Sequence, residues 1–267
     1  MGTVSEGAGW QGAAVYPLGP VAVNRGADYV RAMARPYVRQ LLSGRDFALD
    51  NQAAHGMQNF VYLLGDLDTR ECLVVDPAWN VRDILRIAAA DDMKIVGALC
   101  THYHPDHIGG TMYGITVDGL PTLLAENPCP IHVHKHECAG VQKVTGLSKT
   151  DLTVHESGDK VTVGGIEVEL LHTPGHTPGS LCFRIHDAVF AGDTLFLQGC
   201  GRVDLPGGDP DEMYYTLSQR LSSLPDETIL FPGHAYGGES APMGVVRRTN
   251  PYLKAENLAQ FRRTRGV

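Results

Sequence analysis

One short segment, THYHPDHIGG at positions 101–110, carries four side chains that bind metals well: His102, His104, Asp106 and His107. Neutral imidazole and carboxylate are ligands of zinc, iron and manganese rather than of calcium. His102 and His104 alternate along the chain, so in an extended segment both can face one cation. Asp106 and His107 follow the turn at Pro105 and can face a second cation. The segment predicts a metal centre that needs partners elsewhere in the chain.

Three further metal-capable side chains come directly after predicted strands. His176 lies in HTPGHTPGS, Asp193 ends AVFAGD, and His234 ends TILFPGH. Glycine and proline beside them let the backbone turn tightly next to an ion, and strand ends are where loops carry chemistry on a rigid sheet. We therefore predict that these side chains join the histidine segment, with Asp193 as a candidate bridge between two cations.

A second histidine group has a weaker pattern. His132, His134 and His136 alternate in IHVHKHE, which is strand spacing. No supporting carboxylate or turn glycine accompanies them, so we interpret them as an exposed polar strand face. A further metal site is the alternative.

The elements that must position the chemistry indicate a mixed α/β chain. Apolar, β-branched runs predict strands at 59–66, 71–78, 94–100, 131–136, 152–156, 160–173, 180–185, 188–193 and 228–234. Apolar residues at helical spacing predict helices over 81–92 and 211–224. The second of these helices is capped by Asp209 and begins at Pro210.

The N-terminal part of the chain follows different patterns. Residues 1–23 are rich in glycine and alanine, and we expect a flexible segment there. Apolar spacing predicts a helix over 24–42, kinked at Pro36, within a helical extension over about 24–50. Its apolar stripe is expected to pack on the body of the protein, with a lid or a homodimer contact as the alternative. No repeat or linker divides the remainder, so 24–267 is predicted to be a single domain.

Composition excludes several classes of partner. The net charge is −8, and no block of lysine or arginine precedes the last few residues, which argues against nucleic acid. No apolar run approaches the ~20 residues that cross a bilayer, and the N-terminus lacks the pattern of a secretion signal. The six cysteines show no CxxC motif, as expected of reduced thiols in a cytoplasmic protein. Nucleic acid and the membrane are therefore not expected partners.

The motifs THYHPDH, TPGHTPG, AGDTLF and PGHAY together resemble those of the metallo-β-lactamase superfamily. They span residues ~59 to 236 and look most similar to the branch that holds glyoxalase II-type thioesterases and persulfide dioxygenases. The resemblance implies a four-layer αββα sandwich, with two mixed sheets inside and helices on the outer faces. The strands and helices predicted above fit that architecture.

The resemblance also implies a site, because all seven family ligand positions are filled in the family's order. The first cation would take His102, His104 and His176, the second Asp106, His107 and His234, with Asp193 between them. Two divalent cations, zinc in the first instance, would turn a bridging water into a metal-bound hydroxide and polarise a carbonyl. Asp106 would be the catalytic residue that orients this nucleophile. Asp76 would hold the histidine segment through hydrogen bonds, with a simple turn residue as the alternative.

The segments LFLQGCGRVDLPGG and GHAY resemble those that hold a thiol cofactor in both branches. By that match, Arg202 and Tyr236 would contact the glutathione part of a substrate. Glyoxalase II usually has lysine in the place of Arg202 and an aromatic residue in the place of Asp204. It also carries a long helical C-terminal domain, whereas only a short tail follows His234. Arg202 followed by Asp204 looks more like the dioxygenases.

Two features favour the hydrolases instead. The motif GHTPGS is the one that the hydrolases ordinarily carry. The segment 111–150 is longer than in either reference family, and we expect this insert to reshape the pocket wall. We predict a glyoxalase II-like hydrolase of a thioester or related small ester. One alternative is a mononuclear iron persulfide dioxygenase acting on glutathione persulfide, with Fe(II) at His102, His176 and Asp193. A lactonase of the same fold and a non-catalytic metal-binding scaffold are further alternatives.

Overall fold

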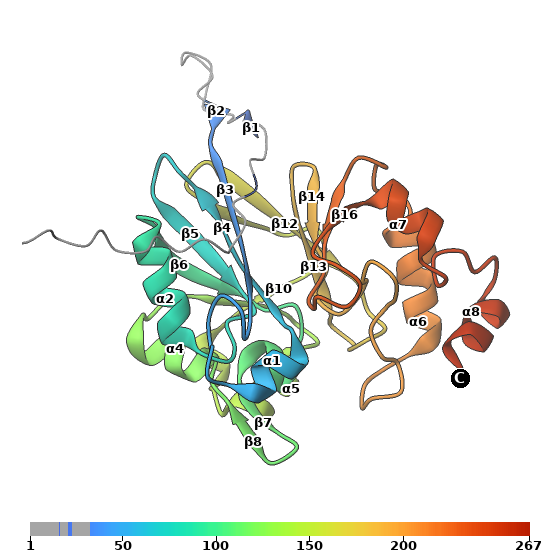
Figure 1. Cartoon of the computed structure of the whole chain (residues 1–267), viewed down its shortest axis with the longest axis horizontal. Coiled ribbons are helices and arrows are strands. Elements are labelled where there is room, and N and C mark those ends of the chain that lie inside the picture. Colours follow the sequence, from blue (N-terminus) through green and yellow to red (C-terminus); the bar gives the residue numbers. More distant parts are fainter. Residues whose placement is uncertain (1–15, 17–20, 23–32) are drawn as a thin grey trace, which may run out of the picture.

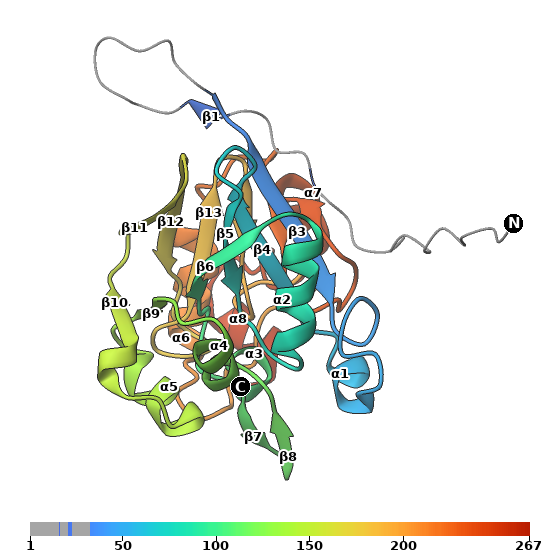
Figure 2. The same cartoon turned by 90° about the vertical axis from the view of Figure 1, so that its left-hand side faces the viewer.

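The structure, a computed structural model, describes Tyr16, residues 21–22 and residues 33–267. Two six-stranded sheets face each other, and helices lie on the outer face of each sheet (Figures 1 and 2). The predicted αββα sandwich of two mixed sheets is confirmed. In the described part of the chain, every helix is too short or too polar to span a bilayer.

The first sheet has the strand order β10-β9-β6-β5-β4-β3. Its strands are β3 (Pro36–Leu42), β4 (Phe60–Asp66), β5 (Glu71–Val75), β6 (Lys94–Leu99), β9 (Ile131–His134) and β10 (Leu152–His155). β5, β6, β9 and β10 run parallel to one another, while β3, β4 and β5 pair antiparallel. The carboxyl ends of the parallel strands therefore meet at one edge, where the histidine segment leaves β6.

The second sheet has the order β11-β12-β13-β14-β15-β16. Its strands are β11 (Lys160–Val163), β12 (Ile166–His172), β13 (Leu181–Ile185), β14 (Ala188–Phe190), β15 (Ile229–Phe231) and β16 (Ala241–Pro242). All its pairs are antiparallel except β14 and β15, which run parallel. Asp193 and His234 follow these two strands, so they emerge from the same end of the sheet.

Short helices and hairpins complete the fold. They are β1 (Val21–Ala22), β2 (Met33–Ala34), α1 (Gln52–Met57), α2 (Val81–Ala90), α3 (Pro105–Ile108), β7 (Gly110–Met112), β8 (Ile115–Val117), α4 (Leu120–Glu126), α5 (Cys138–Thr145), the 3₁₀-helix η1 (Lys149–Asp151), α6 (Pro210–Tyr215), the π-helix η2 (Thr216–Arg220), α7 (Met243–Thr249) and α8 (Leu258–Arg265). α2 and α4 lie on the side of the first sheet, and α6, α7 and α8 on the side of the second (Figure 1).

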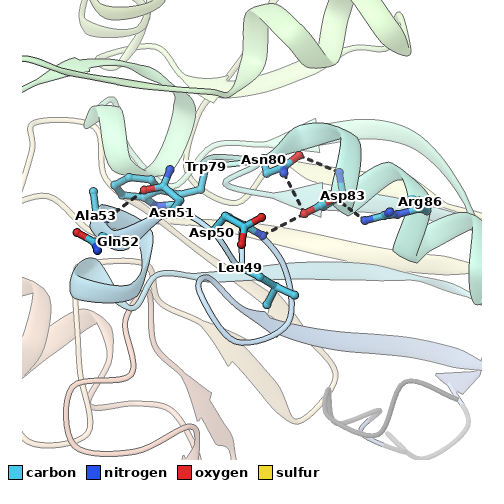
Figure 3. Close-up of a pocket in the computed structure, with 10 residues that line it drawn as sticks. Leu49, Asp50, Asn51, Gln52, Ala53, Trp79, Asn80, Asp83 and Arg86 are labelled. Atoms are coloured by element: carbon cyan, nitrogen blue, oxygen red, sulfur yellow. Dashed lines mark hydrogen bonds and ion pairs between the residues drawn. The ribbon is translucent and has the colours of Figure 1, made fainter. Parts of the chain in front are cut away.

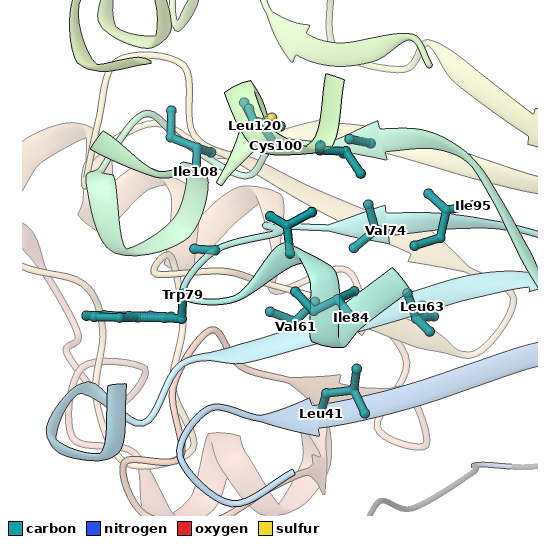
Figure 4. Close-up of a cluster of buried hydrophobic side chains, with 14 of the residues drawn as sticks. Leu41, Val61, Leu63, Val74, Trp79, Ile84, Ile95, Cys100, Ile108 and Leu120 are labelled. Carbon is teal, nitrogen blue, oxygen red and sulfur yellow. The ribbon is translucent and has the colours of Figure 1, made fainter. Parts of the chain in front are cut away.

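Three apolar clusters fill the spaces between the four layers. The cluster between the sheets contains Tyr62, Phe183, Phe190 and Phe231, all at most 2% exposed. The cluster between the first sheet and its helices includes Leu63, Val74, Ile84 and Leu120 (Figure 4). Burying one such side chain contributes about 1.5–3 kcal/mol relative to leaving it exposed. The loops of the site are therefore carried on a packed frame.

The helix predicted over 24–42 is wrong where the structure describes it. Met33–Ala34 and Pro36–Leu42 are the strands β2 and β3. Tyr37 and Leu41 belong to the cluster between the first sheet and its helices, called the outer apolar cluster below, whereas Val38 belongs to the cluster between the sheets. Both faces of β3 are thus apolar, which erases the alternation that marks a strand and leaves a spacing that mimics a helix.

The predicted helical extension over about 24–50 is also wrong after β3, because no helix lies between Leu42, the last residue of β3, and Gln52, the first residue of α1. Residues 24–32 lie outside the described residues, as does the flexible segment predicted at 1–23 apart from Tyr16 and Val21–Ala22. The division into a terminal segment and one domain stays a prediction. The helix predicted at 211–224 begins at Pro210 under the cap of Asp209, but its helical part ends at Arg220.

Candidate metal centre

Four loops that follow strands bring the seven predicted ligands together. In the first group, His102, His104 and His176 have ligand atoms within 4.8 Å of one another. In the second group, Asp106, His107 and His234 meet the same limit. The first two of these residues lie on α3, which begins at Pro105, so the proline divides the histidine segment between the two groups.

The first group is closely packed. His176 Nε2 lies 2.9 Å from His104 Nδ1, and the His102 ring centroid lies 4.7 Å from the centroids of both other rings. His102 Nε2 is buried and has no hydrogen-bond partner among the described residues. A buried polar atom without a partner is costly in a folded protein unless a ligand satisfies it.

The second group has similar dimensions. His107 Nε2 lies 3.2 Å from His234 Nε2, and Asp106 Oδ2 lies 3.4 Å and 3.5 Å from these two nitrogens. Asp193 Oδ1 is 3.3 Å from each of them. The other oxygen of Asp193, Oδ2, is 3.6 Å from His176 Nε2. Asp193 therefore faces both groups, as a bridge must.

Backbone carbonyls fix the tautomers of two histidines. His176 Nδ1 lies 2.7 Å from the carbonyl oxygen of Arg202, and His234 Nδ1 lies 2.7 Å from that of Met57. A carbonyl oxygen can only accept, so each Nδ1 carries the proton and donates it. The Nε2 lone pair of each ring is then directed at the centre, as metal-binding histidines require.

Asp76 and Thr101 fix two further rings, those of His102 and His107, in the same way. The Thr101 hydroxyl donates to Asp76 Oδ2 at 2.6 Å and therefore accepts from His102 Nδ1 at 2.9 Å. His107 Nδ1 donates to Asp76 Oδ2 at 2.9 Å, and Asp76 Oδ1 accepts from the Thr101 amide at 2.8 Å. Asp76 thus holds the histidine segment through its hydrogen bonds, and four rings direct Nε2 lone pairs inward.

The charges of the centre fit cations. Burial and the neighbouring His107 hold the pKa of His102 well below its ordinary value, and burial lowers the pKa of His104 to about 4. Both rings are therefore neutral ligands at pH 7. Burial alone would lower the pKa of His107. The carboxylates of Asp193 and Asp106 outweigh this effect and hold the pKa well above its ordinary value. The carboxylates thus favour a positive charge at this position, and a divalent cation would supply it.

A cavity of about 1010 Å³ opens onto the centre and is lined by residues of both groups. The insert supplies Met112, Tyr113, Lys143 and Val144 to its wall, and Arg265 of α8 adds a cation. The segment expected to reshape the pocket therefore does line it.

Arg202 and Tyr236, the predicted substrate contacts, both line this cavity. The Arg202 guanidinium forms two hydrogen bonds with Asp204, of 3.0 Å and 2.6 Å. The Tyr236 ring stacks on His234, with ring centroids 4.6 Å apart and planes 7° from parallel. Arg202 also reaches the centre through its backbone carbonyl, a role that the side-chain pattern did not reveal.

Two buried residues beside the second group were not predicted from the sequence. Asn59 Nδ2 donates to Asp106 Oδ2 at 3.0 Å, and Trp79 Nε1 donates to Asn59 Oδ1 at 2.9 Å. Asn59 directly precedes β4 and Trp79 follows β5. No motif marks either of them, and only their contacts show their place.

Glu137 was also missed, although it directly follows the second histidine group. Its carboxylate accepts from the Tyr103 amide at 2.8 Å, the Thr177 hydroxyl at 2.9 Å and the Gly179 amide at 2.7 Å. It therefore ties the histidine segment to the loop that carries His176.

The second histidine group lies outside the metal centre. The metal-capable groups among the described residues contain none of His132, His134 and His136. His134 is 2% exposed and stacks on His172, with ring centroids 4.0 Å apart, while His132 Nδ1 lies 2.9 Å from His155 Nε2. The interpretation as an exposed strand face is therefore wrong for His134.

Comparison with known proteins points in the same direction. A family model described as the metallo-beta-lactamase superfamily matches residues 56–234. The mitochondrial persulfide dioxygenase ETHE1 of Mus musculus is 31% identical over 229 residues, covering 84% of this chain and 83% of that protein. A hydroxyacylglutathione hydrolase of Polaromonas sp. is 36% identical over 183 residues, covering 67% and 63%. The crystal structure of ETHE1 from Myxococcus xanthus superposes with a TM-score of 0.67 at 29% identity, covering 86% and 89%.

Proposed function

The chain belongs to the metallo-β-lactamase superfamily, and from that premise we propose that it is a metal-dependent hydrolase of a thioester or a related small ester. The observation that carries the proposal is the position of Asp193, whose two oxygens face two complete ligand groups. A site for two cations is an arrangement that many metallo-hydrolases use.

The roles of the residues follow from their positions. The first cation would be held by His102, His104 and His176, the second by Asp106, His107 and His234, with Asp193 shared. When bound, two divalent cations, zinc in our proposal, lower the pKa of a coordinated water and polarise a carbonyl oxygen. Asp106 lines the cavity, so we assign it the catalytic role of accepting a hydrogen bond from the attacking water. Asp76 keeps the rings of His102 and His107 in the required tautomers.

The cavity supports a small anionic substrate such as a glutathione conjugate. Lys143 and Arg265 place positive charge in its wall. The Arg202–Asp204 pair offers one cation and one anion, which suits the carboxylate and ammonium groups of a γ-glutamyl moiety. We propose that Arg202 binds this part of the substrate and that the Tyr236 ring packs against it.

The test combines metal analysis with assays of the purified protein. We expect two zinc ions per chain and release of free thiol from S-lactoylglutathione or another thioester. Asp106→Asn should remove this turnover. A chain with both ions bound that hydrolyses no thioester would contradict the proposal, and turnover of acyl-homoserine lactones alone would indicate a lactonase.

A second candidate is a mononuclear iron persulfide dioxygenase, and the ETHE1 structure that covers 86% of this chain favours it. The one Fe(II) would be held by His102, His176 and Asp193, the two-histidine, one-carboxylate set of non-haem iron oxygenases. One iron per chain, oxygen consumption with glutathione persulfide, and an Asp106→Ala variant that keeps its metal would replace the hydrolase with this candidate.

A further inference from the structure

The side-chain amide of Asn59 contacts every member of the second ligand group. Its nitrogen, Nδ2, lies 3.0 Å from Asp106 Oδ2, 3.4 Å from His107 Nε2 and 3.5 Å from His234 Nε2. Asn59 is 1% exposed, so water does not compete for these contacts. The residue sits directly behind the second cation site and is not one of the seven family ligands.

The orientation of this amide is set by Trp79. The indole Nε1–H is a donor only, and it lies 2.9 Å from Asn59 Oδ1. The oxygen of the amide must therefore face the indole, and the nitrogen must face Asp106. An amide without such a partner could turn by 180° at little cost in shape and present its oxygen to the carboxylate, which would repel it.

Trp79 is itself held firmly. Its side chain is 4% exposed in the outer apolar cluster (Figure 4), and its backbone amide donates to the Asp118 carbonyl at 2.9 Å. Its φ of +74° lies in the left-handed region, which is costly for a bulky residue and persists only where the surroundings impose it. The ring also forms part of a surface pocket of about 680 Å³, beside Asn51 and Gln52 (Figure 3).

We propose that Trp79 and Asn59 form a positioning pair that sets the affinity of the second cation. Asn59 donates to the oxygen of Asp106 that faces His107 and His234, and so fixes that oxygen where a cation would need it. The first group gains its orientation elsewhere, from Thr101 and the Arg202 carbonyl. The pair therefore acts on one cation and not on the other. This inference rests on the proposed two-cation site.

The test is a zinc titration of the metal-free protein by calorimetry with a competing chelator. Trp79→Phe keeps an aromatic side chain, although a smaller one, and removes the N–H, and Asn59→Leu removes the amide at similar volume. We expect either change to weaken the second ion about 10- to 100-fold while the first stays within about 3-fold, because outer partners of ligands typically contribute that much to metal affinity. If Trp79→Phe fails to fold, as judged by circular dichroism, Asn59→Leu decides the question.

The matched control is Tyr62→Phe. It removes a buried hydroxyl that donates to the Pro232 carbonyl, close to His234 in sequence, without touching a ligand. Equal weakening of the second ion in this control would show general loosening and overturn the inference, as would unchanged second-ion affinity in both test variants. A wild-type chain that takes up only one ion would instead overturn the two-cation site itself.

Discussion

Replacing Asp76 by asparagine should change the stability of the histidine segment and its affinity for the second cation, and the two effects can be measured separately. The carboxylate accepts three hydrogen bonds, from the amide and hydroxyl of Thr101 and from His107 Nδ1. In Asp76→Asn, the oxygen can keep the Thr101 amide, but the new NH₂ group then faces His107 Nδ1–H. The Thr101 hydroxyl can rotate and accept from this NH₂, although its own proton then loses the Asp76 oxygen. The Nδ1–H of His107 is left facing another donor.

Each molecule of the variant can then have one of two tautomers of His107. If His107 keeps its tautomer, the lost hydrogen bond to a charged group lowers the free energy of unfolding by about 1.5–3 kcal/mol. If His107 moves its proton to Nε2, the hydrogen bond is restored but the lone pair facing the second cation is lost. We therefore expect Asp76→Asn to weaken the second ion about 10- to 100-fold, as the loss of an outer partner typically does.

Zinc titration and urea unfolding in chelator measure the two effects separately. The matched control is Asp66→Asn, which changes a buried carboxylate at the far end of β4 that accepts from the Gly165 and Asp68 amides. This control should lose stability without losing zinc. An Asp76→Asn chain that binds both ions as tightly as the wild type would refute the reasoning from tautomers.

Three further predictions address activity, substrate and pH. Asp193→Ala should abolish turnover with the circular dichroism spectrum largely kept, and unchanged turnover would contradict the assignment of the bridge. Lys143→Ala should raise KM about 2- to 5-fold with little change in kcat, as expected for one solvent-accessible charge pair; an unchanged KM for an anionic thioester would remove this residue from substrate binding. Burial lowers the pKa of His132 and of His134 to about 4 from 6.5, so the unfolded state binds more protons than the folded state between these values. The free energy of unfolding should therefore fall as the pH falls from about 6.5 to 4, and urea unfolding of the wild type and of a His132→Gln variant, whose profile should be flatter, checks this.

The clustering of the candidate ligands could be predicted because their signal is local. His102 and His104 share one short segment, and Asp193 and His234 each end a recognisable strand beside glycine. The convergence of Asp193 and His234 follows from β14 and β15 running parallel, which the structure shows. Residue type and strand position were enough for this part of the site.

The residues that hold the ligands could not be predicted, because their signal is a contact between distant positions. Trp79 and Asn59 meet across 20 positions of sequence, and Asn59 reaches Asp106 across 47. A tryptophan after a strand reads as core, and this one does belong to the core. The prediction for the segment of β3 was wrong for a related reason. Apolar side chains on both of its faces leave no periodicity that distinguishes a strand from a helix.

The position of Glu137 has a consequence for how this fold can change. Its carboxylate joins Tyr103, which follows a strand of one sheet, to Thr177 and Gly179, which follow a strand of the other. The two sheets are thereby joined, through Glu137, by hydrogen bonds to the loop after β6 and to the loop after β12. A substitution at one of the candidate ligands would leave these three hydrogen bonds in place, so we expect it to leave the relative position of the two sheets unchanged.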